Sequence, residues 1–191
     1  MGGAKMIRTL ISLFLLLPSL AFAGQGMGPG PGCKTYSAGS SCDTVEQSGG
    51  IDTADMILST TYLQVSHSFT ASSSYGLCSA RFSLWKTGTP TETITVELWS
   101  DNAGAPSAKI SDVGTISAST ITTSPALYSF TGISAPLTSA TRYHYVFIAT
   151  MSGTNTIRID RNSSGAERNY RYTSSWALDD SSSALVFDNY K

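Results

Sequence analysis

The strongest constraint on the fold is an alternation of polar and apolar residues, with a period of two, from about Thr60 onward. Residues 93–99 read Thr-Ile-Thr-Val-Glu-Leu-Trp, which puts every second side chain on one apolar face. This is the pattern of a half-buried β-strand. Residues 143–148 carry large apolar side chains on both faces, which indicates a central strand.

Other short runs with strand character follow at regular intervals, and turn-forming residues separate them. The further strands are predicted at 63–71, 109–116, 126–131, 156–160, 168–173 and 184–188. The turns are predicted at 86–90, 101–106, Gly132, 152–153 and 162–165. The gaps are too short for helical crossovers, so the strands pair antiparallel. The sequence therefore predicts an all-β protein, an antiparallel β-sandwich of jelly-roll type.

The N-terminus has the features of a secretory signal peptide. Lys5 and Arg8 precede an apolar run at 10–17, and Ala21-Phe22-Ala23 supplies the small residues of a cleavage site. The run is shorter than the roughly 20 residues that span a bilayer. We expect no membrane span and a secreted protein, in the periplasm, on the cell surface or in the extracellular space.

Three segments follow from this organisation. Residues 1–23 are the signal peptide, and residues 24–58 are a Gly/Pro-rich leader with a polar N-terminal segment. Within that segment, residues 52–58 are expected to form one helical turn capped by Asp52. Residues 59–191 form the predicted sandwich domain.

Charge argues against a nucleic-acid partner. Charged residues make up 13 % of the chain and the formal net charge is −1. Nucleic-acid binding needs a basic stripe that contacts several phosphates, and this composition does not supply one.

The three cysteines follow the signal peptide, and an oxidising compartment favours disulfides between them. We expect a local bridge between Cys33 and Cys42, which flank eight residues. Cys78 shares its parity with Phe82 and points inward. It is either a buried thiol that acts as a small apolar residue, or one end of a bridge from the N-terminal segment into the sandwich.

Catalytic patterns are weak. His67 and His144 both lie in strand-like segments, and the chain contains no Gly-x-Ser-x-Gly, no HExxH and no CxxC. The carboxylates show no spacing that indicates a catalytic pair. We expect no enzymatic activity.

Two oxygen-rich pairs are candidates for calcium, the only cofactor that we consider. They are Asp101-Asn102 and Asp179-Asp180. Carboxylate and amide oxygens suit Ca²⁺. The alternative is that these residues simply favour turns.

Several aromatic residues are candidates for sugar binding, because exposed rings stack on the apolar faces of pyranoses. Trp99 shares a face with Thr95 and Glu97, which points it away from the core. The candidate ligand-binding residues are Trp99, Tyr170, Arg171, Tyr172 and Trp176. The alternative for each ring is packing within the sandwich.

A resemblance to a known domain type agrees with this interpretation. It is carried by residues 80–88, 94–107, 128–130 and 137–147 and by Trp176, within roughly 63–190. These stretches resemble bacterial surface domains of the choice-of-anchor type. The resemblance implies an extracellular jelly-roll module, related in shape to carbohydrate-binding modules, with no catalytic residues to carry over.

The expected function is non-enzymatic binding of an extracellular glycan or another surface polymer. The alternative is a structural subunit that assembles with copies of itself, through its N-terminal segment or its sheet edges, into a fibre, appendage or coat.

Overall fold

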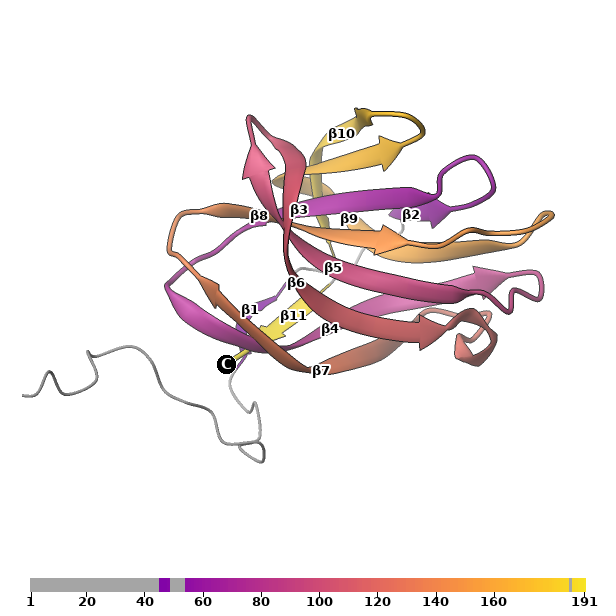
Figure 1. The fold of residues 1–191 in the computed structure, drawn as a ribbon, viewed down its shortest axis with the longest axis horizontal. Helices are drawn as coiled ribbons and strands as arrows, with labels where there is room; N and C mark the ends of the chain where they lie inside the picture. Colours follow the sequence, from indigo (N-terminus) through magenta and orange to yellow (C-terminus); the bar gives the residue numbers. More distant parts are fainter. Residues whose placement is uncertain (1–44, 49–53, 186) are drawn as a thin grey trace, which may run out of the picture. The chain divides into compact units, whose positions relative to one another are not determined.

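The computed structural model describes residues 45–48, 54–185 and 187–191, and these residues form an all-β protein (Figure 1). A single 3-10 turn, η1 (Ala118–Thr120), is the helical element of this part of the chain. None of the described residues forms a helix with the length and apolarity that a membrane crossing requires. The strands are β1 (Val45–Ser48), β2 (Ala54–Leu58), β3 (Gln64–Thr70), β4 (Tyr75–Thr87), β5 (Thr93–Asn102), β6 (Ala105–Ser117), β7 (Ala126–Leu137), β8 (Arg142–Ile148), β9 (Thr156–Tyr172), β10 (Trp176–Leu185) and β11 (Phe187–Tyr190).

The strands form two antiparallel layers that pack face to face, as the sequence predicted. The long strand β9 belongs to both layers. Its first half pairs with β4 and β2, and its second half pairs with β3 and β10. The first layer contains β7, β4, β11, the first half of β9, and β1 and β2 along one edge. The second contains β6, β5, β8, β3, the second half of β9, and β10.

Aromatic side chains fill the space between the layers. Phe82 of β4 makes edge-to-face contacts with Tyr145 and Phe147 of β8, with ring centroids 4.8 and 5.1 Å apart. Phe69 of β3 stacks on Tyr145 and contacts Phe187 of β11. Burying each such side chain stabilises the folded state by roughly 1.5–3 kcal/mol. These contacts hold the sandwich together.

The predicted faces of the central strands are confirmed. The side chains of Ile94, Val96 and Leu98 are 0 % exposed and belong to the core between the layers. In β8, Val146 is also 0 % exposed although it faces away from that core. The second layer is therefore covered on both sides at β8.

The N-terminal part of the sheet differs from the expectation. Ala54–Leu58 is the strand β2, not a helical turn, because Met56 and Leu58 alternate into the core with 2 % and 0 % of their surface exposed. β1 and β2 both precede the predicted start of the sandwich at residue 59. Each pairs with the layer through β11 or β9.

Two predicted breaks lie inside strands. The expected turn at 162–165 falls within β9, where the pairing with β10 jumps from Glu167 to Asn162 while β10 advances by one residue. A bulge therefore takes up the residues that the sequence assigned to a turn. Gly132, with a φ of 78°, likewise lies within β7.

Cys78 lies in β4, and its side chain is 7 % exposed, as its parity predicted. Its Sγ atom is 3.2 Å from the carbonyl oxygen of Tyr190 in β11. Cys33 and Cys42 lie outside the described residues, so the expected Cys33–Cys42 bridge is untested, and the register of the described strands favours the alternative, a bridge from the N-terminal segment to Cys78. The strand register limits the distance between the N-terminal segment and Cys78. Val45 pairs with Tyr190, and Tyr190 pairs with Ser79, the neighbour of Cys78.

We expect a disulfide that includes Cys78. Two strand spacings of about 4.8 Å separate Val45 from Ser79, and Cys42 precedes Val45 by three residues, which reach about 10 Å. Peptide mapping of the non-reduced, processed protein by mass spectrometry gives the connectivity. A peptide that links Cys42 to Cys78 is the expected product, and one that links Cys33 to Cys42 would contradict it.

A buried polar contact fixes β11 against the core. The Tyr145 hydroxyl donates to Asn189 Oδ1, and Asn189 Nδ2 donates to the Tyr75 hydroxyl at 3.0 Å. Asn189 and Tyr145 are both 0 % exposed. Burial raises the pKa of Tyr145 well above its ordinary value, so this hydroxyl keeps its proton and remains a donor.

The variant Asn189→Ala tests this contact. It removes the acceptor of the buried Tyr145 hydroxyl, and a buried donor that loses its acceptor costs about 1–3 kcal/mol. The free energy of unfolding, measured with urea, should fall by about that much or more. Thr131→Ala on the exposed face of β7 is the control and should change it little. Equal unfolding free energies for both variants would contradict this role.

Candidate ligand-binding site

The candidate site lies on the outer face of the second layer, the face turned away from the core. Register defines its members, since directly paired residues on adjacent strands point to the same side. Trp99 of β5 pairs with His144 of β8. Tyr172 of β9 pairs with Trp176 of β10. Leu98, between Glu97 and Trp99, faces the core, so the predicted outward direction of Trp99 is confirmed.

Three of the five predicted ligand-binding residues come together on this face. The rings of Tyr172 and Trp176 meet at 63° with centroids 5.1 Å apart, and the rings of Trp99 and Trp176 meet at 80° and 6.3 Å. All three side chains are half-buried. We call Trp99, Tyr172 and Trp176 the aromatic cluster. It joins strands that are more than 70 residues apart in the sequence.

Charged side chains beside the cluster hold Trp99 in place. The indole Nε1 of Trp99 donates to Glu97 Oε2 at 2.8 Å. Lys109 Nζ donates to the other oxygen of Glu97 at 2.8 Å and also pairs with Asp112. These hydrogen bonds raise the pKa of Lys109. The cluster therefore has a carboxylate and an ammonium group at its side.

Tyr170, another predicted ligand-binding residue, is buried behind the cluster. It is 6 % exposed, and its ring contacts the ring of His144 at 5.9 Å. Its hydroxyl bonds to Arg168, a contact that raises the pKa of Arg168. For Tyr170 the packing alternative accounts for its position.

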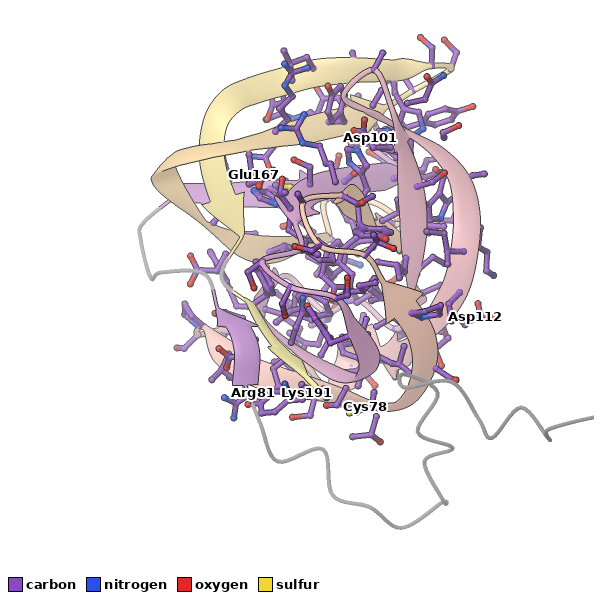
Figure 2. All side chains as sticks on the ribbon, turned by 90° about the vertical axis from the view of Figure 1, so that its left-hand side faces the viewer. Cys78, Arg81, Asp101, Asp112, Glu167 and Lys191 are labelled. Atoms are coloured by element: carbon purple, nitrogen blue, oxygen red, sulfur yellow. The ribbon has the colours of Figure 1, made fainter. Side chains whose placement is uncertain are left out.

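The hairpin between β5 and β6 ends beside these residues. Ala103 and Gly104 form its two-residue turn, with φ values of 52° and 99°, as a type I′ turn requires. A Cβ atom on Gly104 would lie 2.2 Å from Arg168 Nη1 and 3.3 Å from the Tyr170 hydroxyl. The tip of this hairpin is therefore packed against β9, which forms a second hairpin with β10. Figure 2 labels Asp101 at this part of the molecule, well away from Cys78.

A serine, a histidine and an aspartate are joined in line under the cluster. Ser66 Oγ lies 3.1 Å from His144 Nδ1, and His144 Nε2 lies 2.9 Å from Asp101 Oδ1. Because the Asp101 carboxylate accepts, Nε2 carries the proton and Nδ1 accepts from Ser66. Burial lowers the pKa of His144, while the bond to Asp101 opposes that shift. The imidazole is neutral.

These three hydrogen-bonded side chains stabilise the fold. Ser66 and His144 are both 0 % exposed, and Ser66 lies within β3 and not at an exposed turn. A nucleophilic serine must reach its substrate, and this one is covered. The second oxygen of Asp101 accepts from the backbone N–H of Gly104 at 3.0 Å. The hydrogen bonds through Ser66, His144 and Asp101 therefore connect the tip of the β5–β6 hairpin to the middle of the sheet.

Arg171, the remaining predicted ligand-binding residue, lies on the opposite face of β9 from Tyr172. Its guanidinium carbon sits 4.7 Å from the centroid of the Tyr62 ring, and Nη2 pairs with Asp179 at 2.8 Å. A hollow of about 190 Å³ adjoins this pair, lined by Tyr62, Arg171, Thr173, Ala177, Leu178 and Asp179. Arg171 is therefore separate from the aromatic cluster.

The calcium candidates have other contacts. Both carboxylate oxygens of Asp101 are bonded, Asn102 ends β5, and Asp179 pairs with Arg171. Asp180 is placed only by its backbone, within β10 and opposite Asn169. In the described part of the chain, no three His, Cys, Asp or Glu residues are grouped to hold a metal ion. Calcium at either pair stays a prediction without structural support.

Sequence reasoning missed the supporting side chains. Glu97 and Lys109 were not candidates, although the Glu-x-Trp spacing puts Glu97 on the face of Trp99. Nothing local indicates the bond between His144 and Asp101, because the two residues are 43 positions apart. Only the β5–β8 register brings them together.

Comparison of the chain with protein-family models, with curated proteins and with solved structures found no match. The site must therefore be interpreted from its own geometry.

The pH dependence of stability tests the state of His144. Its lowered native pKa means that the unfolded chain, with an ordinary value near 6.5, takes up a proton that the native state does not. The contribution of His144 to stability is complete above about pH 6.5 and declines as the pH falls below it. The variant His144→Gln cannot take up this proton. Its free energy of unfolding should therefore fall less between about pH 7.5 and pH 5.5 than that of the natural protein. Equal slopes would refute a neutral buried imidazole.

Proposed function

We propose that this protein is a secreted, non-enzymatic module that binds carbohydrate through the aromatic cluster. The single observation that carries the proposal is the convergence of Trp99, Tyr172 and Trp176, half-buried, on one face of the sheet. The resemblance to bacterial extracellular jelly-roll domains agrees with it. The proposed location is the periplasm, the cell surface or the extracellular space.

The chemistry of the cluster suits a sugar. The C–H groups of a pyranose make one face apolar, and that face packs on an aromatic ring, while its hydroxyls need hydrogen-bond partners. Glu97 accepts and Lys109 donates beside Trp99. Each of these charges is paired, so the site favours a neutral, hydroxyl-rich ligand over a strongly charged one.

The packing alternative explains less of this arrangement. Rings that serve only the core are covered, as Tyr145 and Phe147 are with 0 % of their surface exposed. The three cluster rings remain partly exposed in an otherwise Ser- and Thr-rich surface. Leaving large aromatic rings partly in water has a cost that a binding role accounts for.

The variant Trp176→Ala tests the proposal, because Trp176 contacts both other rings. Soluble oligosaccharides derived from cellulose, chitin, xylan and mannan serve as probes for the processed protein, with calorimetry as the measurement. Removing one ring should weaken binding by about tenfold or more, since stacking on an aromatic face contributes roughly 1–3 kcal/mol in comparable cases.

Leu127→Ala is the matched control. Leu127 is a 54 % exposed apolar residue on β7, in the other layer. It should bind as the natural protein does. Binding that survives in Trp176→Ala would contradict the proposal, and so would a protein that binds no member of the panel and no insoluble form of the same polysaccharides.

Assembly with copies of itself is the second candidate, and one observation favours it. β1 and β2, from the predicted N-terminal segment, form an edge of the first layer. An edge strand can exchange between copies or add a neighbour. Light scattering on the calorimetry samples separates the two functions, because a subunit that assembles gains mass with concentration. A bridge from Cys42 to Cys78 within one chain would oppose exchange of β1.

A further inference from the structure

The rings of the aromatic cluster stand across one another and do not share a plane. Trp99 and Trp176 meet at 80°, and Tyr172 and Trp176 meet at 63°. A sugar stacks with its apolar face parallel to an aromatic ring. A flat array of sugars, such as the surface of a crystalline polysaccharide, therefore needs several rings in one plane. Neither contacting pair in the cluster offers that plane.

The crossed arrangement is held by the surrounding contacts. Trp99 is fixed through its bond to Glu97, which Lys109 holds in turn. Trp176 has an edge-to-face contact with Trp99 and another with Tyr172, and such contacts stabilise by about 0.5–1.5 kcal/mol each. Turning one ring into the plane of its neighbour would give up these contacts. The cluster is thus preorganised with its rings crossed.

A second observation limits what can approach this face. The β5–β6 and β9–β10 hairpins meet over it, with Gly104 of one packed against Arg168 and Tyr170 of the other. β10 also contacts β6 and β3. Between them, Ser66 and Val146 are 0 % exposed although they face outward from the core. The three rings therefore lie on two different hairpins, Trp99 on β5 and the other two at the β9–β10 turn, and not side by side on one flat strand surface.

We propose that the cluster binds single soluble glycan chains or their ends, and not the flat surface of a crystalline polysaccharide. This proposal rests on the carbohydrate-binding function above and narrows its ligand. One ring stacks on the face of a sugar, and its crossed neighbour contacts the edge of the same sugar. Glu97 and Lys109 bond to hydroxyls at that edge.

The test compares two physical forms of the same sugar. Cello-oligosaccharides are paired with crystalline cellulose, and chito-oligosaccharides with crystalline chitin. Calorimetry measures affinity for the oligosaccharides, and depletion from solution measures retention on the crystals. For the sugar that binds, we expect affinity for the oligosaccharide and no more retention on the crystal than Trp176→Ala shows.

Single-ring variants test whether both crossed contacts are used. Trp99→Ala and Tyr172→Ala should each lower oligosaccharide affinity by about tenfold, with Leu127→Ala unchanged. Circular dichroism verifies that each variant folds. Trp99→Phe keeps a ring but loses the bond to Glu97, so it serves if Trp99→Ala does not fold, and it should also weaken binding.

The outcomes separate this inference from the function on which it depends. If the protein is retained on the crystals but does not bind the matching oligosaccharide, the inference is overturned and carbohydrate binding is left in place. Oligosaccharide affinity that is insensitive to Trp99 and Tyr172 overturns the crossed-ring site. Binding to neither form of either sugar, nor to the other members of the panel, overturns both proposals.

Discussion

The register of β9 is the constraint on which the rest of the structure depends. This strand supplies neighbours to both layers, and in its second half alternate residues face opposite sides. Tyr172 faces the aromatic cluster, while Arg171 faces Tyr62 and Asp179. A slip of one residue would exchange them. Ile157 and Ile159, both 0 % exposed, oppose such a slip in the first half, because it would move two core side chains into water.

The outer face of the second layer shows how polar groups are accommodated under cover. Ser66, His144 and Asp101 form one line in which each proton has an acceptor. An unpaired polar group in such a place costs about 1–3 kcal/mol, so the line is stable only when complete. Its far end fixes the turn at Gly104. The same bonds that satisfy buried groups therefore set where the β5–β6 hairpin ends, and with it the backbone of Trp99.

The sequence was sufficient for properties that depend on local alternation. The fold class, the strand around Ile94 to Leu98 and the outward direction of Trp99 all follow from a period of two. It was insufficient where long-range pairing overrides local preference. The residues at 162–165 have turn composition, yet they lie within β9, at the bulge where its pairing with β10 shifts. Likewise, Asp52 suggested a helix cap, but the core position of Met56 decides for β2.

The same distinction applies to the candidate site, where residue type could be read from the sequence and strand register could not. Residue type selected Trp99, Tyr172 and Trp176, and the structure brings these three together. Residue type also selected Arg171, which register assigns to the other side of β9. Proximity along the chain was the misleading signal, because neighbours in a strand lie on opposite faces. Tyr172 and Trp176 meet through the β9–β10 hairpin, whereas Trp99 reaches them from β5, a strand that pairs with neither, and no local pattern encodes that contact.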